Sequence, residues 1–166
     1  QRPLGRLDAG VVDHFAAGYA RADLLLRLPF SPAMDAFPRS EEIPLVATPG
    51  RCRRGEIARI AGCDPDRKWV LLSFTTLDWD AGALARVGEI RGCEFFTVLP
   101  LRWESPNLHA LDRGRVPFSD VVASVDAVVS KPGFGILSDC VVNRKPLAYA
   151  ERSDFREYPV LETAAH

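Results

Sequence analysis

The sequence has little charge imbalance and lacks any long apolar run. Its 166 residues hold 21 Lys and Arg against 22 Asp and Glu, a formal net charge of -1, so we expect no basic surface of the kind that binds nucleic acid. Apolar runs such as residues 69–72 and 140–142 are far shorter than the roughly 20 residues of a membrane-spanning helix. With 47% hydrophobic residues, the chain is predicted to be globular and without a membrane span.

A C-x-x-C pair is absent, although the chain has four cysteines. The four cysteines are Cys52, Cys63, Cys93 and Cys140. None has a nearby histidine that could complete a zinc site. Three stand beside apolar or strand-like segments, which favours buried, reduced thiols in a cytoplasmic protein and no bound metal. The chain opens on Gln1 with no sustained apolar stretch behind it, so we predict no secretory signal and expect a piece of a longer protein.

The first third of the chain differs in pattern from the rest. Apolar spacing predicts a helix over residues 9–20 and a strand over 22–30, ended by prolines. Residues 31–54 contain four prolines and are predicted to be a linker, with a short strand possible over 45–47. The arginines at its end, Arg51, Arg53 and Arg54, are interpreted as a solvated cluster.

Beyond the linker, predicted strands and helices alternate over residues 55–166. The strands are expected at 68–75, 94–101, 107–111, 127–130 and 146–150, and the helices at 56–61, 80–90, 118–125, 135–143 and 154–163. Strands that are apolar on both faces indicate a parallel sheet with helices on both sides, which is an α/β, three-layer, Rossmann-like domain. Ligands bind such sheets at the carboxyl ends of the strands.

One strand end carries a two-glycine turn that leads directly into a helix. The spacing is G-x-G-x-x-S, with a serine where a dinucleotide fingerprint has its third glycine. Free amides at such a helix start suit a phosphate, although the glycines could simply permit a tight turn. A carboxylate one turn later could accept ribose hydroxyls, or could be a first-turn acid favoured by the helix dipole. The candidate residues are Ser130, Gly133, Phe134, Gly135, Ser138 and Asp139.

Two other loops follow predicted strands in the same way. Ser73, Thr75 and Thr76 could hold a diphosphate, but they are also ordinary turn and cap residues. Asp154, Arg156 and Glu157 open the predicted last helix, where they could bind sugar hydroxyls or form a solvated first turn. The histidines are scattered, and none stands beside a Ser or Cys in a nucleophile setting, so no catalytic residue is assigned.

Taken together, these loops resemble the C-terminal half of a GT-B glycosyltransferase. The resemblance is most specific to the branch with the lipid-II-forming N-acetylglucosaminyltransferase (the family 28 C-terminal domain) and related uncharacterised bacterial proteins. It covers about residues 68–161. The segments that carry it are Val128-Val-Ser-Lys-Pro-Gly-Phe-Gly-Ile-Leu-Ser-Asp139-Cys, Pro146-Leu-Ala-Tyr149 and Asp154-Phe-Arg-Glu-Tyr158.

The resemblance implies a domain that holds a nucleotide sugar, such as a UDP-sugar, as substrate, with no obligatory metal and no other cofactor. Asp139 stands where the family has its ribose-binding carboxylate, usually Glu. Arg156 and Glu157 stand where the family reads the donor sugar, typically with two glutamines or an acid and a glutamine. Thr75 and Thr76 replace the usual glycines of the first loop, where their side chains could crowd the diphosphate.

In this family the acceptor pocket and the usual base belong to an N-terminal Rossmann domain, of which residues 1–30 resemble a remnant. We therefore expect the chain to be the donor-binding part of a hexosyltransferase, inactive alone, with the N-terminal domain or a partner chain as its complement. Two alternatives stay open. One is another activity on a nucleotide sugar, such as an epimerase, a hydrolase or a sensing domain fused to a sugar kinase. The other is a non-catalytic module.

The helix and strand of the remnant would lack their sheet. Their apolar faces are expected to pack on the second domain or on another copy of the chain, which predicts weak self-association.

Overall fold

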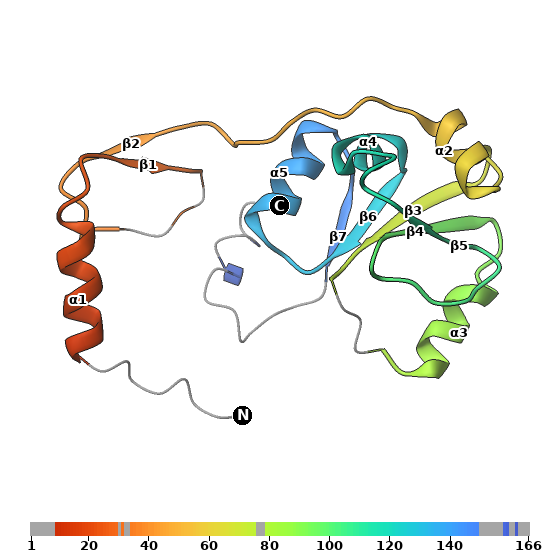
Figure 1. The fold of residues 1–166 in the computed structure, drawn as a ribbon, viewed down its shortest axis with the longest axis horizontal. Coiled ribbons are helices and arrows are strands. Elements are labelled where there is room, and N and C mark those ends of the chain that lie inside the picture. Colours follow the sequence, from red (N-terminus) through yellow and green to blue (C-terminus); the bar gives the residue numbers. More distant parts are fainter. Residues whose placement is uncertain are drawn as a thin grey trace. The chain divides into compact units, whose positions relative to one another are not determined.

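The computed structural model describes residues 9–29, 31, 34–75, 79–149, 158, 159 and 162. The chain divides into two compact units, Gln1–Val46 and Ala47–His166, and each has its own sheet (Figure 1). The segment 31–54, predicted as a linker, is shared between the two units.

The first unit contains one helix and a pair of parallel strands. These elements are α1 (Ala9–Tyr19), β1 (Leu25–Arg27) and β2 (Ser40–Glu42). The predicted helix is confirmed, and the predicted strand is present but shorter. The prediction of a strand over 45–47 is wrong, because β1 pairs instead with residues 40–42. The N–H of Leu25 donates to Arg39 O and the N–H of Ile43 donates to Arg27 O, both at 2.9 Å. Pro44 follows and has no N–H to continue the pairing.

The second unit contains a five-stranded parallel sheet with the order β5-β4-β3-β6-β7. Its elements are α2 (Arg54–Ala61), β3 (Lys68–Ser73), α3 (Ala81–Glu89), β4 (Cys93–Val98), β5 (Leu108–Leu111), α4 (Phe118–Ser124), β6 (Ala127–Ser130), α5 (Phe134–Val142) and β7 (Leu147–Tyr149). The predicted alternation of strands and helices is confirmed. The helix predicted over 154–163 lies mostly outside the described residues.

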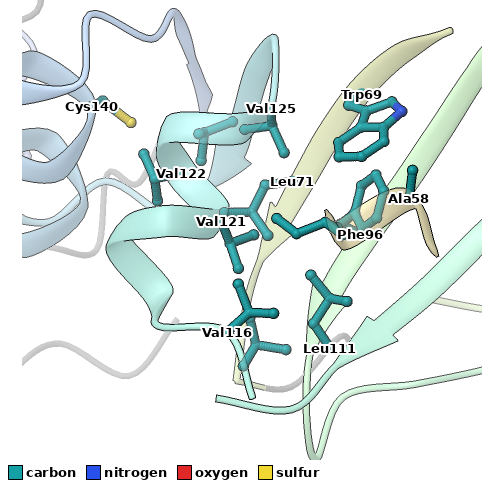
Figure 2. Packing of buried hydrophobic residues seen from close by; sticks show 13 residues of the cluster. Ala58, Trp69, Leu71, Phe96, Leu111, Val116, Val121, Val122, Val125 and Cys140 are labelled. Carbon is teal, nitrogen blue, oxygen red and sulfur yellow. The ribbon is translucent and has the colours of Figure 1, made fainter. Parts of the chain in front are cut away.

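Apolar side chains project from both faces of this sheet, as is typical of parallel sheets. On one face, Trp69 and Phe96 pack with ring centroids 4.5 Å apart, beneath residues of α2, α4 and α5. Figure 2 shows Val121 of α4 beside Leu71. On the other face, Val87 of α3 packs with Leu72 and Phe95. The sheet therefore lies between helical layers.

The strand order places a topological switch point between β3 and β6. From β3 the chain proceeds to β4 and β5 on one side, then returns through α4 to β6 and continues to β7 on the other. In open parallel sheets, the crevice for a ligand opens at the carboxyl ends of the strands that flank such a point. Ser73 and Ser130, which are register partners, are the last residues of these two strands.

Residues 50–54, here called the entry segment, are tied to the helical layer by their backbone. Three of its N–H groups donate to side chains about 70 to 90 residues further along the chain. The pairs are Gly50 N to Asn143 Oδ1 at 2.9 Å, Arg51 N to Asp120 Oδ1 at 2.8 Å and Arg53 N to Ser124 Oγ at 2.8 Å. The end of the predicted linker is thus part of the second unit.

The interpretation of the arginines as a solvated cluster is wrong for Arg53 and Arg54. Arg53 bonds both carboxylate oxygens of Glu56 and reaches Asp120 at 3.3 Å. Arg54 lies over the Trp69 ring, 4.3 Å from its centroid, and bonds to Asp126 at 3.2 Å. A planar guanidinium satisfies several acceptors at once, which explains arginine here.

A buried charged group lies at the opposite end of the sheet from the switch point, near the start of β4. Glu94 is only 4% exposed. Its carboxylate is 2.7 Å from His109 Nε2 and 3.1 Å from Arg67 Nη1. The His109 ring also packs on Phe96, with centroids 5.3 Å apart. Glu94 therefore has a partner for each of its oxygens, as a buried carboxylate needs.

The cysteines are free thiols that differ in burial: Cys140 is buried, Cys63 and Cys93 are half-buried, and Cys52 is exposed. Burial raises the pKa of Cys63 to about 11, and the nearby Glu94 charge acts in the same direction. The expectation of buried thiols is thus confirmed for Cys140 and met only in part by Cys63 and Cys93, whereas Cys52 is exposed in the entry segment.

Candidate functional site

The ends of β3 and β6 are joined by a side-chain bond at the switch point. The Ser130 hydroxyl donates to Ser73 O at 2.8 Å, and Ser130 is 5% exposed. This bond fixes the two strand ends against each other. Ser130 is therefore engaged in the protein's own structure, and Ser73 contributes its carbonyl.

The β6–α5 turn brings a helix start to this place, as the sequence predicts. Gly133 is the residue before the first turn of α5, and no side chain caps this end. The first bond of the helix runs from Leu137 N to Gly133 O at 3.1 Å, so the amides of Phe134, Gly135 and Ile136 have no carbonyl within the helix. No acid occupies the first turn. These amides and the positive end of the helix dipole suit an anion.

The two glycines of the turn are not required by the fold. Gly133 has an extended backbone with φ of -173°, and Gly135 is helical; neither has a positive φ. A Cβ atom built on either glycine meets nothing within 4 Å. The alternative that these glycines merely permit a tight turn is therefore not supported, because any residue could adopt these conformations in the space present.

Ser138 and Asp139 lie one turn further along α5. Ser138 is 4% exposed. Asp139 is half-buried, and burial raises the pKa of its carboxyl group. Within the described part of the chain, neither its carboxylate nor the Ser138 hydroxyl has a hydrogen-bond partner. Burial, followed by the Asp139 charge, also raises the pKa of the Cys140 thiol to about 11.

The other predicted site residues are only partly placed. Thr75, the second residue after β3, is exposed, so its side chain is available to a ligand. Thr76 lies outside the described residues, and so do Asp154, Arg156 and Glu157. The structure thus brings Ser73, Ser130 and the start of α5 together.

Sequence reasoning assigned no role to one further residue of the turn. Lys131 follows Ser130 directly, is exposed, and forms no ion pair with a described residue. Its charge would favour an anion at the start of α5. The sequence signal that could have identified Lys131 is its position within the motif, between Ser130 and Gly133.

The described residues contain neither a candidate metal site nor a candidate membrane span. Among them, no three His, Cys, Asp or Glu side chains are grouped so as to hold a metal ion. None of the helices within the described ranges combines the length and apolar character needed to cross a membrane.

Comparisons with known proteins find similarity in fold. No family model and no curated protein matches the sequence. The glycosyltransferase SnogD from Streptomyces nogalater superposes with a TM-score of 0.52 at 19% identity, over 83% of this chain and 41% of that one. The glycotransferase of kitacinnamycin superposes with a TM-score of 0.53 at 16% identity, over 86% of this chain and 39% of that one.

These likenesses confirm the fold class. The chain has the α/β, GT-B-like Rossmann fold with a parallel sheet that the sequence predicts. It spans about two fifths of the length of either structure. At this level of identity the likeness concerns the fold, and chemistry has to be argued from the site.

Proposed function

We propose that this chain is the donor-binding part of a glycosyltransferase, which holds a nucleoside diphosphate sugar, such as a UDP-sugar, for transfer of a hexosyl group. The observation that carries the proposal is the glycine pair of the β6–α5 turn. Neither backbone conformation nor packing requires Gly133 or Gly135, yet both lie at the switch point. Close approach of a diphosphate to the backbone is the remaining reason for residues without a side chain.

In this proposal each group has a defined task. The free amides of α5 bind the diphosphate and stabilise the charge that develops on it as the glycosyl bond breaks. Lys131 adds a positive charge at the same turn. Asp139, which lacks a partner among the described residues, accepts the ribose hydroxyls. Asp154, Arg156 and Glu157 are proposed to contact the sugar, and the family 28 branch is the proposed relationship.

The acceptor site and the catalytic base are proposed to belong to an N-terminal domain, of which residues 1–30 form the end. Support comes from the matched share of the chain, which is larger than Ala47–His166 alone and so extends into the first unit. The proposal also places the protein in the cytoplasm, where free thiols persist.

The first test is thermal protection by a nucleotide. UDP or UDP-N-acetylglucosamine at ten times its dissociation constant should stabilise the chain by about 1.4 kcal/mol, a rise in Tm of roughly 3 to 5 °C. Gly135→Ala should leave the Tm of the free protein unchanged or slightly higher, because Ala suits a helix and has room. The same variant should abolish the shift, since its methyl group blocks the approach to the amides.

Gly55→Ala is the matched control, because Gly55 is also helical and also has nothing within 4 Å of an added Cβ. It should keep the full nucleotide shift. A chain that no nucleotide stabilises at millimolar concentration would contradict the proposal. So would an undiminished shift in Gly135→Ala.

The second test concerns Asp139 and pH. Its carboxylate must be ionised to accept two hydroxyl bonds, and burial raises its pKa above the ordinary 3.8. Nucleotide affinity should therefore fall as the pH is lowered. The fall should begin at a higher pH than it would if the binding carboxylate were an exposed aspartate. Without ligand the sign is opposite: a raised pKa in the folded state makes the ionised group unfavourable at neutral pH.

Asp139→Asn should thus raise the Tm of the free protein slightly at pH 7 while it removes the nucleotide shift and its acid dependence. Nucleotide titrations by calorimetry from neutral to acidic pH measure both effects. Equal affinity and pH dependence in the wild type and the variant would exclude the ribose-binding role.

A further inference from the structure

Asn143, at the end of α5, holds two other parts of the second unit through one side chain. Its Oδ1 accepts the N–H of Gly50, in the entry segment, at 2.9 Å. Its Nδ2 donates to the backbone oxygen of Asp139 at 2.8 Å, and its own backbone N–H donates to the same oxygen at 3.2 Å. The Asn143 carboxamide therefore connects α5 to the segment through which the chain enters the second unit.

The two side-chain bonds of Asn143 form and break together. A carboxamide is planar and carries its acceptor and its donor in fixed positions on one group. Rotation of the side chain away from Gly50 therefore also withdraws Nδ2 from the Asp139 oxygen. A flipped amide would set a donor against the Gly50 N–H and an acceptor against the Asp139 carbonyl. The attached and detached states of Gly50 are thus two distinct arrangements of Asn143.

Asp139 also belongs to the proposed nucleotide site. Its carboxylate is proposed to bind the ribose, while its carbonyl is held by Asn143. The whole of α5 has nine residues and is about 14 Å long. A ligand that binds the start and the middle of so short a helix also restrains the turn to which Asn143 is bonded, and a restrained partner is easier to hold in place.

The other backbone ties of the entry segment lead to a different helix. The N–H of Arg51 donates to Asp120 and the N–H of Arg53 to Ser124, and both acceptors belong to α4. Of the three bonds, the Gly50 bond alone reaches α5. It lies three residues after the start of the second unit at Ala47. The donor site and the connection between the two units therefore meet at Asn143.

We propose that Asn143 couples the nucleotide site to the attachment of this connection, an inference that rests on the proposed function. A bound nucleoside diphosphate strengthens the bond between Gly50 and Asn143. This bond in turn strengthens nucleotide binding by the same factor, because coupling between two sites is reciprocal. Since the bonds that change are neutral hydrogen bonds, the coupling factor is about three- to tenfold. The helix that binds the donor thus also controls how firmly the connection is held.

Amide hydrogen exchange by NMR, with and without saturating UDP, tests this coupling. UDP should slow the exchange of the Gly50 N–H about three- to tenfold, and that of Arg53, whose acceptor lies in α4, by less than about twofold. Asn143→Asp keeps an acceptor for Gly50 but loses the donor to Asp139. In this variant Gly50 should stay protected but lose its response to UDP, whereas a residue that only caps the helix would leave the response intact.

Calorimetric titration with UDP gives the reciprocal readout. Asn143→Ala should weaken binding about three- to tenfold, although its side chain is not part of the proposed nucleotide site. Ser124→Ala is the matched control, because it removes the acceptor of the Arg53 N–H and no bond to α5. It should change the affinity by less than about twofold.

The outcomes separate this inference from the proposed function. UDP that binds without slowing the exchange of Gly50 would overturn the inference alone. Equal losses of affinity in Asn143→Ala and Ser124→Ala would also overturn it, because they would show a general loosening of the second unit. A wild-type chain that does not bind UDP at all would contradict the proposed function and the inference with it.

Discussion

Gly50→Ala should destabilise the second unit by about 2 to 4 kcal/mol, since overpacking and lost hydrogen bonds act together. A Cβ at this position would lie 1.9 Å from the carbonyl oxygen of Ser119 and 2.8 Å from the amide nitrogen of Asp120. Both atoms are backbone at the start of α4, so no side chain can swing aside. The entry segment must move away instead, and the Gly50 bond to Asn143 is the first to be lost.

Urea denaturation followed by circular dichroism measures this effect. Gly55→Ala, five residues further on and free of neighbours, should instead stabilise the protein by about 0.5 to 1 kcal/mol, because it replaces a glycine within a helix. If Gly50→Ala unfolds at the same urea concentration as the wild type, the entry segment does not pack on α4 in solution.

Arg54→Ala should lower the free energy of unfolding by about 1 to 3 kcal/mol, because three backbone carbonyls and the Asp126 carboxylate lose their donor together. The guanidinium bonds to Pro65 O at 2.7 Å, to Ser124 O at 3.1 Å and to the backbone oxygen of Arg67. It also neutralises Asp126. Burial opposes ionisation of Asp126, but the Trp69 N–H and Arg54 outweigh it and lower its pKa.

A lowered pKa in the folded state gives stability above the pKa of the unfolded chain, and this stability is lost as the pH falls through the folded value. Arg54→Ala should therefore also weaken the acid-dependent part of the unfolding curve that Asp126 contributes. Arg54→Lys should recover only part of the loss, because an ammonium cannot reach all these acceptors. Arg59, which is exposed on the same helix, provides the control. Arg59→Ala should lower the free energy of unfolding by less than about 0.5 kcal/mol. An equal loss of stability in the two variants would contradict the structural role of Arg54.

These two residues show where sequence reasoning ended. The partners of the entry segment within residues 120–143 lie 67 to 93 residues away, and no local pattern marks such pairs. Three arginines among prolines are typical of an exposed linker. Only in the folded chain do Arg53 and Arg54 meet Asp120 of α4 and the Trp69 ring. Similarly, β2 was not predicted because its pairing with β1 involves Ser40, Glu41 and Glu42, which form no apolar pattern.

The Rossmann-like sheet, by contrast, could be predicted in detail. Each of its strands has a core of adjacent apolar residues bounded by turn signals, and Gly62 ends α2 in the left-handed conformation expected of a helix stop. The motif around Gly133 could be placed at a strand end, but its meaning could not be decided. The strand order, which puts the motif at the switch point, and the space around the glycines are the observations from which a diphosphate site is proposed.

The buried group of Glu94, His109 and Arg67 has a consequence for how the sheet is aligned. β5 is only four residues long, too short for its apolar residues to define a unique position along β4. A slip by one residue would turn His109 to the opposite face of the sheet and leave the Glu94 carboxylate without its nearest partner. A shifted pairing of β5 with β4 thus leaves a buried charge without its partner. The buried polar group thereby favours the correct register of the two strands.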